Sequence, residues 1–115
     1  HLCYSRISDY INYIKALDAD VTTIEASKQI LEVAISLKKA SFKNSIGPGV
    51  YDVHSILIPT TKDIEEKIKI FLKYIPAPKL WINPDCGLKT RNEYEVIESL
   101  KNIVKAVKKI RKKIK

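Results

Sequence analysis

The chain has 115 residues and a formal net charge of +8; 45% of its residues are hydrophobic and 30% are charged, with three Gly and five Pro. This composition suits one small globular domain and excludes collagen-like, low-complexity and disordered chains, while the short apolar runs predict no membrane span and no membrane partner. The whole excess charge lies in residues 101–115, which hold eight Lys or Arg and no acid, because the 13 basic and 13 acidic residues of positions 1–100 cancel.

The first half of the chain alternates short β-rich runs with amphipathic helical patterns. Residues 1–5 read as the end of a strand, and Ser8 is the expected N-cap of the helix that follows. Residues 21–24 are β-branched throughout and predict a strand that ends at Glu25. Ser27 is the expected start of a second helix. The predicted buried stripes of these two helices are Ile11, Ile14 and Leu17, and then Ile30, Leu31, Ala34, Ile35 and Leu37.

The second half repeats this unit twice. Residues 46–53 predict an extended stretch, and residues 60–63 open a helix that Pro76 ends. Residues 79–83 predict the last strand, and the terminal helix is expected to start at about Asn92. The predicted apolar faces are Ile64, Ile68, Phe71, Leu72 and Ile75 in the third helix, and Ile97, Leu100, Val104, Val107, Ile110 and Ile114 in the fourth.

Four strands that alternate with four helices predict βαβ units and a parallel sheet, which places the chain in the α/β class rather than among helical bundles. Helical crossovers bring all carboxyl ends of parallel strands to one edge of the sheet, where such folds carry their chemistry. The unusual polar residues of this sequence fall at those predicted ends. They are His1 and Cys3, Glu25, Asp52 and His54, and Asp85 with Cys86.

An imidazole, two thiols and a carboxylate at one sheet edge form a candidate metal site. Zinc is the ion that accepts nitrogen, sulfur and oxygen ligands together. Taken singly these residues have simpler explanations: each Cys could be a small buried side chain, and Cys3 and Cys86 could pair as a disulfide. Two thiols in a chain with no signal peptide favour a reducing, cytoplasmic compartment instead, and their position at successive strand ends favours a metal.

Two specific strings, at residues 46–55 and 81–91, together with shorter ones at 1–5, 17–21 and 24–25, carry a family resemblance. They are similar to the C-terminal catalytic barrel of cobalamin-independent methionine synthase. The resemblance covers essentially the whole chain and implies zinc-dependent methyl transfer from 5-methyltetrahydrofolate to homocysteine. It also implies that residues 1–115 are the C-terminal half of a TIM (β/α)8 barrel, with four βα units, parallel strands and the N-terminal half missing.

The resemblance also implies roles for individual residues. It places the general acid at His54, which would protonate the folate nitrogen as it leaves, since an imidazole titrates near neutral pH. We infer that Asp52, two residues away on the same face, orients this imidazole and supports its charged form. The implied zinc ligands are His1, Cys3, Glu25 and Cys86.

The expected small-molecule partners are homocysteine and a methyl donor (methyltetrahydrofolate or methyl-corrinoid). The missing half of the barrel is a further expected partner, because four βα units leave two open sheet edges.

One alternative function is that of a corrinoid-dependent thiol methyltransferase of the same fold, although Glu25 and residues 47–55 favour the methionine synthase. A second is a structural zinc module with a closed ligand shell. A third is a basic nucleic-acid-binding protein. We expect no nucleic-acid partner, because a solvated outer helix whose apolar stripe packs inward explains the charge of residues 101–115.

Overall fold

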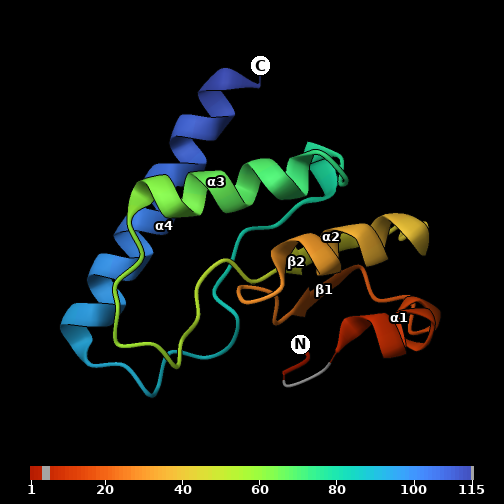
Figure 1. The fold of residues 1–115 in the computed structure, drawn as a ribbon, viewed down its shortest axis with the longest axis horizontal. Helices are drawn as coiled ribbons and strands as arrows, with labels where there is room; N and C mark the ends of the chain where they lie inside the picture. Colours follow the sequence, from red (N-terminus) through yellow and green to blue (C-terminus); the bar gives the residue numbers. More distant parts are fainter. Residues whose placement is uncertain (4–5, 115) are drawn as a thin grey trace.

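Helices and strands alternate along residues 1–3 and 6–114, the part of the chain that this computed structural model describes (Figure 1). In chain order the elements are α1 (Ile7–Ala16), β1 (Val21–Ile24), α2 (Ile30–Lys39), β2 (Ser45–Pro48), α3 (Thr61–Leu72), the 3-10 helix η1 (Ala77–Lys79) and α4 (Glu93–Lys113). This order confirms the α/β class. The strand end expected at residues 1–5 falls partly on positions 4 and 5, which lie outside the described residues. None of the described helices has both the length and the apolar character needed to cross a bilayer.

A parallel ladder joins four segments of the chain. β1 and β2 form its centre, and the segments around Leu2 and at residues 80–83 extend it on either side. The order in space is therefore the order in sequence, and every pairing is parallel. The outer contacts are isolated bridges that join Leu2 to Ile24, Leu80 to Ile46 and Asn83 to Gly49.

The prediction of four regular strands is wrong in extent, because within the described residues only β1 and β2 are continuous strands. In the stretch predicted at 46–53 the continuous strand ends at Pro48, Gly49 keeps a single bridge to Asn83, and residues 79–83 contribute bridges alone. Proline has no N–H to donate to a ladder, which limits the pairing at Pro48. Two single hydrogen bonds hold the chain beyond it: Gly49 N–H donates to the Ile24 carbonyl (2.9 Å), and Val50 N–H donates to the Asn83 carbonyl (3.0 Å).

Local side-chain chemistry starts α3 and α4 where the sequence predicts. The Thr60 hydroxyl accepts a hydrogen bond from Asp63 N–H (3.1 Å), and the Asp63 carboxylate accepts one from Thr60 N–H (3.3 Å). Asn92 and Glu95 form the same reciprocal capping box at the start of α4, with distances of 2.9 and 3.1 Å. Each box satisfies two N–H groups that a helix start otherwise leaves unpaired.

The predicted starts of α1 and α2 are wrong. α1 begins at Ile7 after Arg6, and α2 begins at Ile30 after Gln29, and neither of these N-cap residues makes a side-chain cap. Ser27 lies three residues before α2, and its hydroxyl and its N–H both donate to the Asp85 carboxylate instead of contributing to the helix start. A tertiary contact has therefore taken the group that the local pattern assigned to the helix.

The core lies between the helices and the ladder. Ile11, Ile14, Ala34 and Leu37 are buried as predicted, whereas Leu17 and Leu31 are exposed. Leu17 is the C-cap of α1 and lies beside Tyr10 and Tyr13, which are exposed as well, on a side of the helix that the described residues leave uncovered. The predicted apolar face of α3 is buried at Ile64, Ile68 and Phe71 and half-buried at Leu72, and Ile75 is buried just after the helix ends.

α4 buries a different face from the predicted one. Its buried residues are Ser99, Ile103, Ala106 and Ile110, which pack toward α3. Of the predicted stripe only Ile110 is buried and Val107 is half-buried, while Ile97, Leu100, Val104 and Ile114 are exposed. The small side chains at 99 and 106 allow α3 and α4 to approach closely, and the distance between packed helices depends on the side chains at the contact.

One ion pair crosses the contact between α3 and α4. Glu65 is buried, and its carboxylate lies 3.0 Å from the Lys109 ammonium, which donates a hydrogen bond to it. This hydrogen bond is the largest cause of a lowered pKa for Glu65. Part of the positive charge of residues 101–115 therefore stabilises the packing of α4.

We expect Glu65→Gln to lower the melting temperature by a few degrees at neutral pH, because the buried oxygen loses its charged partner. A lowered folded pKa contributes stability above the ordinary Glu value of 4.5, and this contribution is lost as the pH falls through the folded value. The difference from wild type should therefore shrink in acid, as measured by thermal unfolding from about pH 3 to pH 8. Glu66→Gln, at an exposed position of the same helix, is the control; equal losses in both variants would contradict the role of the pair.

Candidate metal centre

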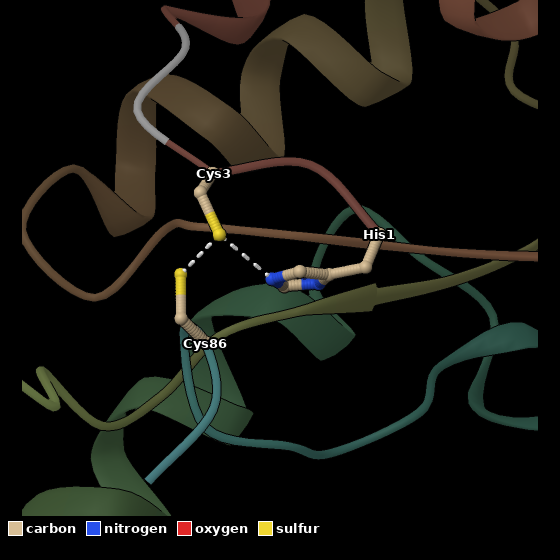
Figure 2. A group of neighbouring side chains, drawn as sticks. All are labelled: His1, Cys3 and Cys86. Carbon is tan, nitrogen blue, oxygen red and sulfur yellow. Dashed lines mark hydrogen bonds between the residues drawn. The ribbon is translucent and has the colours of Figure 1, made fainter. Parts of the chain in front are cut away.

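Three metal-ligating side chains converge at the end of the ladder. His1 and Cys3 come from the N-terminal segment and Cys86 from the loop after residue 83, and all three point toward one another (Figure 2). Cys3 Sγ lies 3.1 Å from His1 Nε2 and 2.6 Å from Cys86 Sγ. Both cysteines are free thiols, so the structure does not contain the alternative disulfide. The three donor atoms all lie within 4.8 Å of one another, close enough to share one ion.

Main-chain pairing of Leu2 places the first two of these side chains. Leu2 N–H donates to the Thr23 carbonyl (3.0 Å), and the Leu2 carbonyl accepts from Glu25 N–H (3.3 Å). This holds the segment extended and parallel to β1. Successive side chains of an extended segment point to opposite faces, so His1 and Cys3 share the face opposite to Leu2. The spacing of two in the sequence predicts this arrangement.

The His1 ring is held on its other side by Thr23 of β1. His1 Nδ1 lies 2.6 Å from the Thr23 hydroxyl, while Nε2 faces the Cys3 sulfur. A metal-binding histidine commonly uses its second ring nitrogen in this way, and the contact fixes the orientation of the ring. Sequence reasoning missed Thr23. Its signal was available, because Thr23 lies two residues before Glu25 and therefore on the same face of β1.

The electrostatics around Cys86 oppose a free thiolate. Burial is the largest cause of a pKa raised to about 12 for the Cys86 thiol, and the hydrogen bond with Cys3 and the charges of Cys3, Glu25 and Asp85 act in the same direction. A cation is the natural counterpart of such a group, because a coordinating thiol loses its proton to the metal. The donor set, one imidazole nitrogen and two sulfurs, is one that zinc accepts, so these residues fit the implied metal.

Glu25 is the one predicted ligand outside this group of three. It follows β1 directly and is half-buried, and its negative charge contributes to the raised pKa of Cys86. The structure thus brings together His1, Cys3 and Cys86, and the ligand role of Glu25 stays a prediction.

The second predicted pair, Asp52 and His54, lies in the loop after β2. Asp52 Oδ1 accepts a hydrogen bond from the main-chain N–H of His54 (3.0 Å), and Asp52 Oδ2 lies 3.6 Å from the Lys28 ammonium. His54 itself is exposed. The described contact of Asp52 therefore shapes the backbone that carries His54, and the effect of Asp52 on the imidazole stays a prediction.

Two residues of the string 81–91 bind the main chain of the loop that carries Asp52 and His54. The Thr90 hydroxyl donates to the Val53 carbonyl (3.1 Å), and Arg91 Nη1 donates to the Ser55 carbonyl (3.1 Å). Arg91 is itself fixed by Glu95, one turn along the chain, at 3.3 Å. Val53 and Ser55 flank His54, so both neighbours of the proposed acid are anchored. Neither Thr90 nor Arg91 was identified from the sequence as part of the site, because this requires the loop to be in place.

Comparison with known proteins identifies the family of this chain. A family model described as the catalytic domain of cobalamin-independent synthase matches residues 1–109. The 5-methyltetrahydropteroyltriglutamate--homocysteine methyltransferase of Mycolicibacterium paratuberculosis is 51% identical over 96% of this chain. The proteins of the same name from Coxiella burnetii and Buchnera aphidicola subsp. Acyrthosiphon pisum are 53% and 49% identical over 97% and 100% of this chain. The chain therefore belongs to the cobalamin-independent synthase catalytic-domain family, which confirms the resemblance. It spans only 14–15% of the length of these curated relatives.

A solved structure shares the fold. The B12-independent methionine synthase from Shewanella sp. W3-18-1, in complex with selenomethionine, matches with a TM-score of 0.83 at 16% sequence identity. The match covers 97% of this chain and 32% of that one. At this low identity the likeness concerns the arrangement of the elements alone.

We expect zinc binding at this centre to release protons, because each cysteine must lose its thiol proton to become a ligand. The apparent zinc affinity should therefore rise with pH, by up to about tenfold per pH unit for each proton displaced. Competition with a chromogenic chelator at several pH values measures this dependence. Cys86→Ser should weaken binding and reduce the slope, and an affinity independent of pH would contradict thiol ligation.

Proposed function

We propose that this chain supplies the metal-binding and proton-donating edge of a catalytic barrel that transfers a methyl group from 5-methyltetrahydrofolate to the sulfur of homocysteine. The observation that carries the proposal is the convergence of His1 Nε2, Cys3 Sγ and Cys86 Sγ at the end of a parallel ladder. Membership of the cobalamin-independent synthase family and the names of the relatives support this reaction and its folate donor, and they favour it over a corrinoid donor.

The ligands proposed for zinc are His1, Cys3 and Cys86, with Glu25 as the fourth. Zinc bound there would favour the thiolate form of homocysteine, the nucleophile that the reaction needs. Thr23 fixes the ring of His1 from behind, which keeps Nε2 directed at the centre. A carboxylate and two cysteine sulfurs give the site excess negative charge, and this suits a site that must keep a bound sulfur nucleophilic.

His54 is the proposed general acid. The ring nitrogen of the folate is a poor leaving group as an anion, so it must gain a proton as its bond to the methyl group breaks. The exposed position of His54 leaves it accessible to a substrate, and its loop is anchored on both sides by Thr90 and Arg91. We propose that Asp52 orients His54 in two ways: its carboxylate accepts from the main-chain N–H of His54, and it also orients the imidazole ring.

The domain proposal is that residues 1–115 form the C-terminal half of a TIM barrel. The two outer segments of the ladder, around Leu2 and at 80–83, support it, since both lie beside apolar side chains that the described residues leave uncovered. Tyr10, Tyr13 and Leu17 are exposed beside the first, and Trp81 and Ile114 beside the second. The proposed occupant of both surfaces is the rest of the catalytic domain, because the chain covers only 32% of the solved protein with the same fold.

We expect His54→Asn, in the complete catalytic protein, to lower turnover by about 10²–10⁴-fold, the usual contribution of a positioned general acid. Zinc content should stay near one per chain, because His54 is not among the three converging ligands. Methyl transfer to homocysteine and metal analysis on the same sample measure both. Activity that survives the substitution would contradict the role of His54.

Residues 1–115 expressed by themselves should show no methyl transfer. The rest of the catalytic domain, which would cover both open sides of the ladder and supply the remaining substrate contacts, would be missing. Co-expression with the remainder of the catalytic domain should restore activity and give a complex of the combined mass by size-exclusion chromatography. A monomer of 13.1 kDa that transfers methyl groups would overturn the half-barrel proposal.

A further inference from the structure

Asp85 is the most buried carboxylate of the described residues, with 1% of its surface exposed. Its Oδ1 accepts hydrogen bonds from the N–H groups of Ala26 and Ser27, both at 3.0 Å, and its Oδ2 accepts one from the Ser27 hydroxyl. Three donors thus converge on one side chain. A buried carboxylate is costly unless hydrogen bonds compensate it, and this one is compensated entirely by the loop after β1.

The main chain of Asp85 is fixed to a second loop. Its N–H donates to the Tyr51 carbonyl (2.9 Å) after β2. Gly49 lies so close that a Cβ there would be 2.0 Å from Asp85 Oδ1 and 2.6 Å from Asp85 Cα. Only glycine at position 49 permits this approach. Asp85 therefore packs between the chain that follows β1 and the chain that follows β2.

Asp85 lies directly beside the candidate metal centre. Cys86 is the next residue in the chain, and Glu25 precedes the two N–H donors of Ala26 and Ser27. The carboxylate of Asp85 therefore links the loop that carries one proposed ligand to the loop that carries another. The described hydrogen bonds of Asp85 go to Ala26, Ser27 and Tyr51, none of them a proposed ligand, so its positioning effect acts through the two backbones.

We propose that Asp85 is a positioning residue for the metal centre: its carboxylate holds the loop of Glu25 against the loop of Cys86, and the affinity of the site for zinc depends on it. This inference rests on the proposed zinc site. An apolar side chain at position 85 would leave the N–H of Ala26 buried without its acceptor and would free the two loops to separate. The three donors also favour a carboxylate, which only accepts hydrogen bonds, at this position.

The test compares Asp85→Ala with Glu65→Gln in the full-length protein. Glu65 is also a buried carboxylate, but it pairs with Lys109 between α3 and α4 and so controls for a general loss of stability. We expect zinc affinity, measured by chelator competition, to fall by about 10–100-fold in Asp85→Ala, the usual range for residues that orient metal ligands, and to stay unchanged in Glu65→Gln. The absorption spectrum of the cobalt(II)-loaded protein should change in the first variant only.

Two milder variants keep the test decisive if Asp85→Ala does not fold. Asp85→Asn retains an Oδ1 that can accept from both N–H groups, so it should recover most of the zinc affinity. Ser27→Ala removes one donor from a half-buried side chain and should weaken zinc binding several-fold.

Each outcome has one meaning. A wild-type protein that binds no zinc would refute the proposed function and the inference with it. A wild-type protein that binds zinc, with unchanged zinc affinity and cobalt spectrum in folded Asp85→Ala, would refute the inference alone. If Asp85→Ala is unfolded, unchanged affinity in Ser27→Ala would refute it in the same way.

Discussion

Parallel main-chain pairing at the centre of the chain is the constraint on which the rest of the structure depends. Because β1 and β2 run in the same direction and are joined by α2, both end at the same edge. The outer segments at Leu2 and 80–83 also pair in parallel, through single bridges. The polar residues next to these segments therefore lie at that edge as well. Residues as distant in sequence as Cys3 and Cys86 meet for this reason alone. A reversed outer segment would send one sulfur to the opposite end of the ladder.

The edge so formed concentrates groups that repel one another when ionised. Burial raises the pKa of the Cys86 thiol most, and the charges of Glu25 and Asp85 raise it further. Burial also raises the pKa of Asp85, against the lowering effect of its hydrogen bonds to Ser27 and Ala26. A bound cation relieves this repulsion, whereas hydrogen bonds alone only moderate it. These residues therefore favour a neutral Cys86 thiol, and a cation bound beside it would favour the thiolate.

Local patterns predicted the parts of this protein that local chemistry controls. The starts of α3 after Thr60 and of α4 after Asn92 and the apolar face of α3 follow from residues within one or two turns of each other, and the structure confirms them. The predictions that failed required knowledge of a distant partner. Ser27 donates to Asp85, 58 residues later, instead of starting α2, and α4 buries the face with Ser99, Ile103, Ala106 and Ile110 rather than most of its predicted stripe.

The sequence by itself determined the α/β class, the parallel direction and the residue types of the candidate site, because hydrophobic periodicity and side-chain alternation depend on neighbours in the chain. A spacing of two was sufficient to place His1 and Cys3 on one face. Only the tertiary structure decided which groups support them: Thr23 behind the imidazole, Asp85 between the loops, and Thr90 and Arg91 beside His54. These contacts join residues from different strand ends, and their geometry exists only once the ladder has brought those ends together.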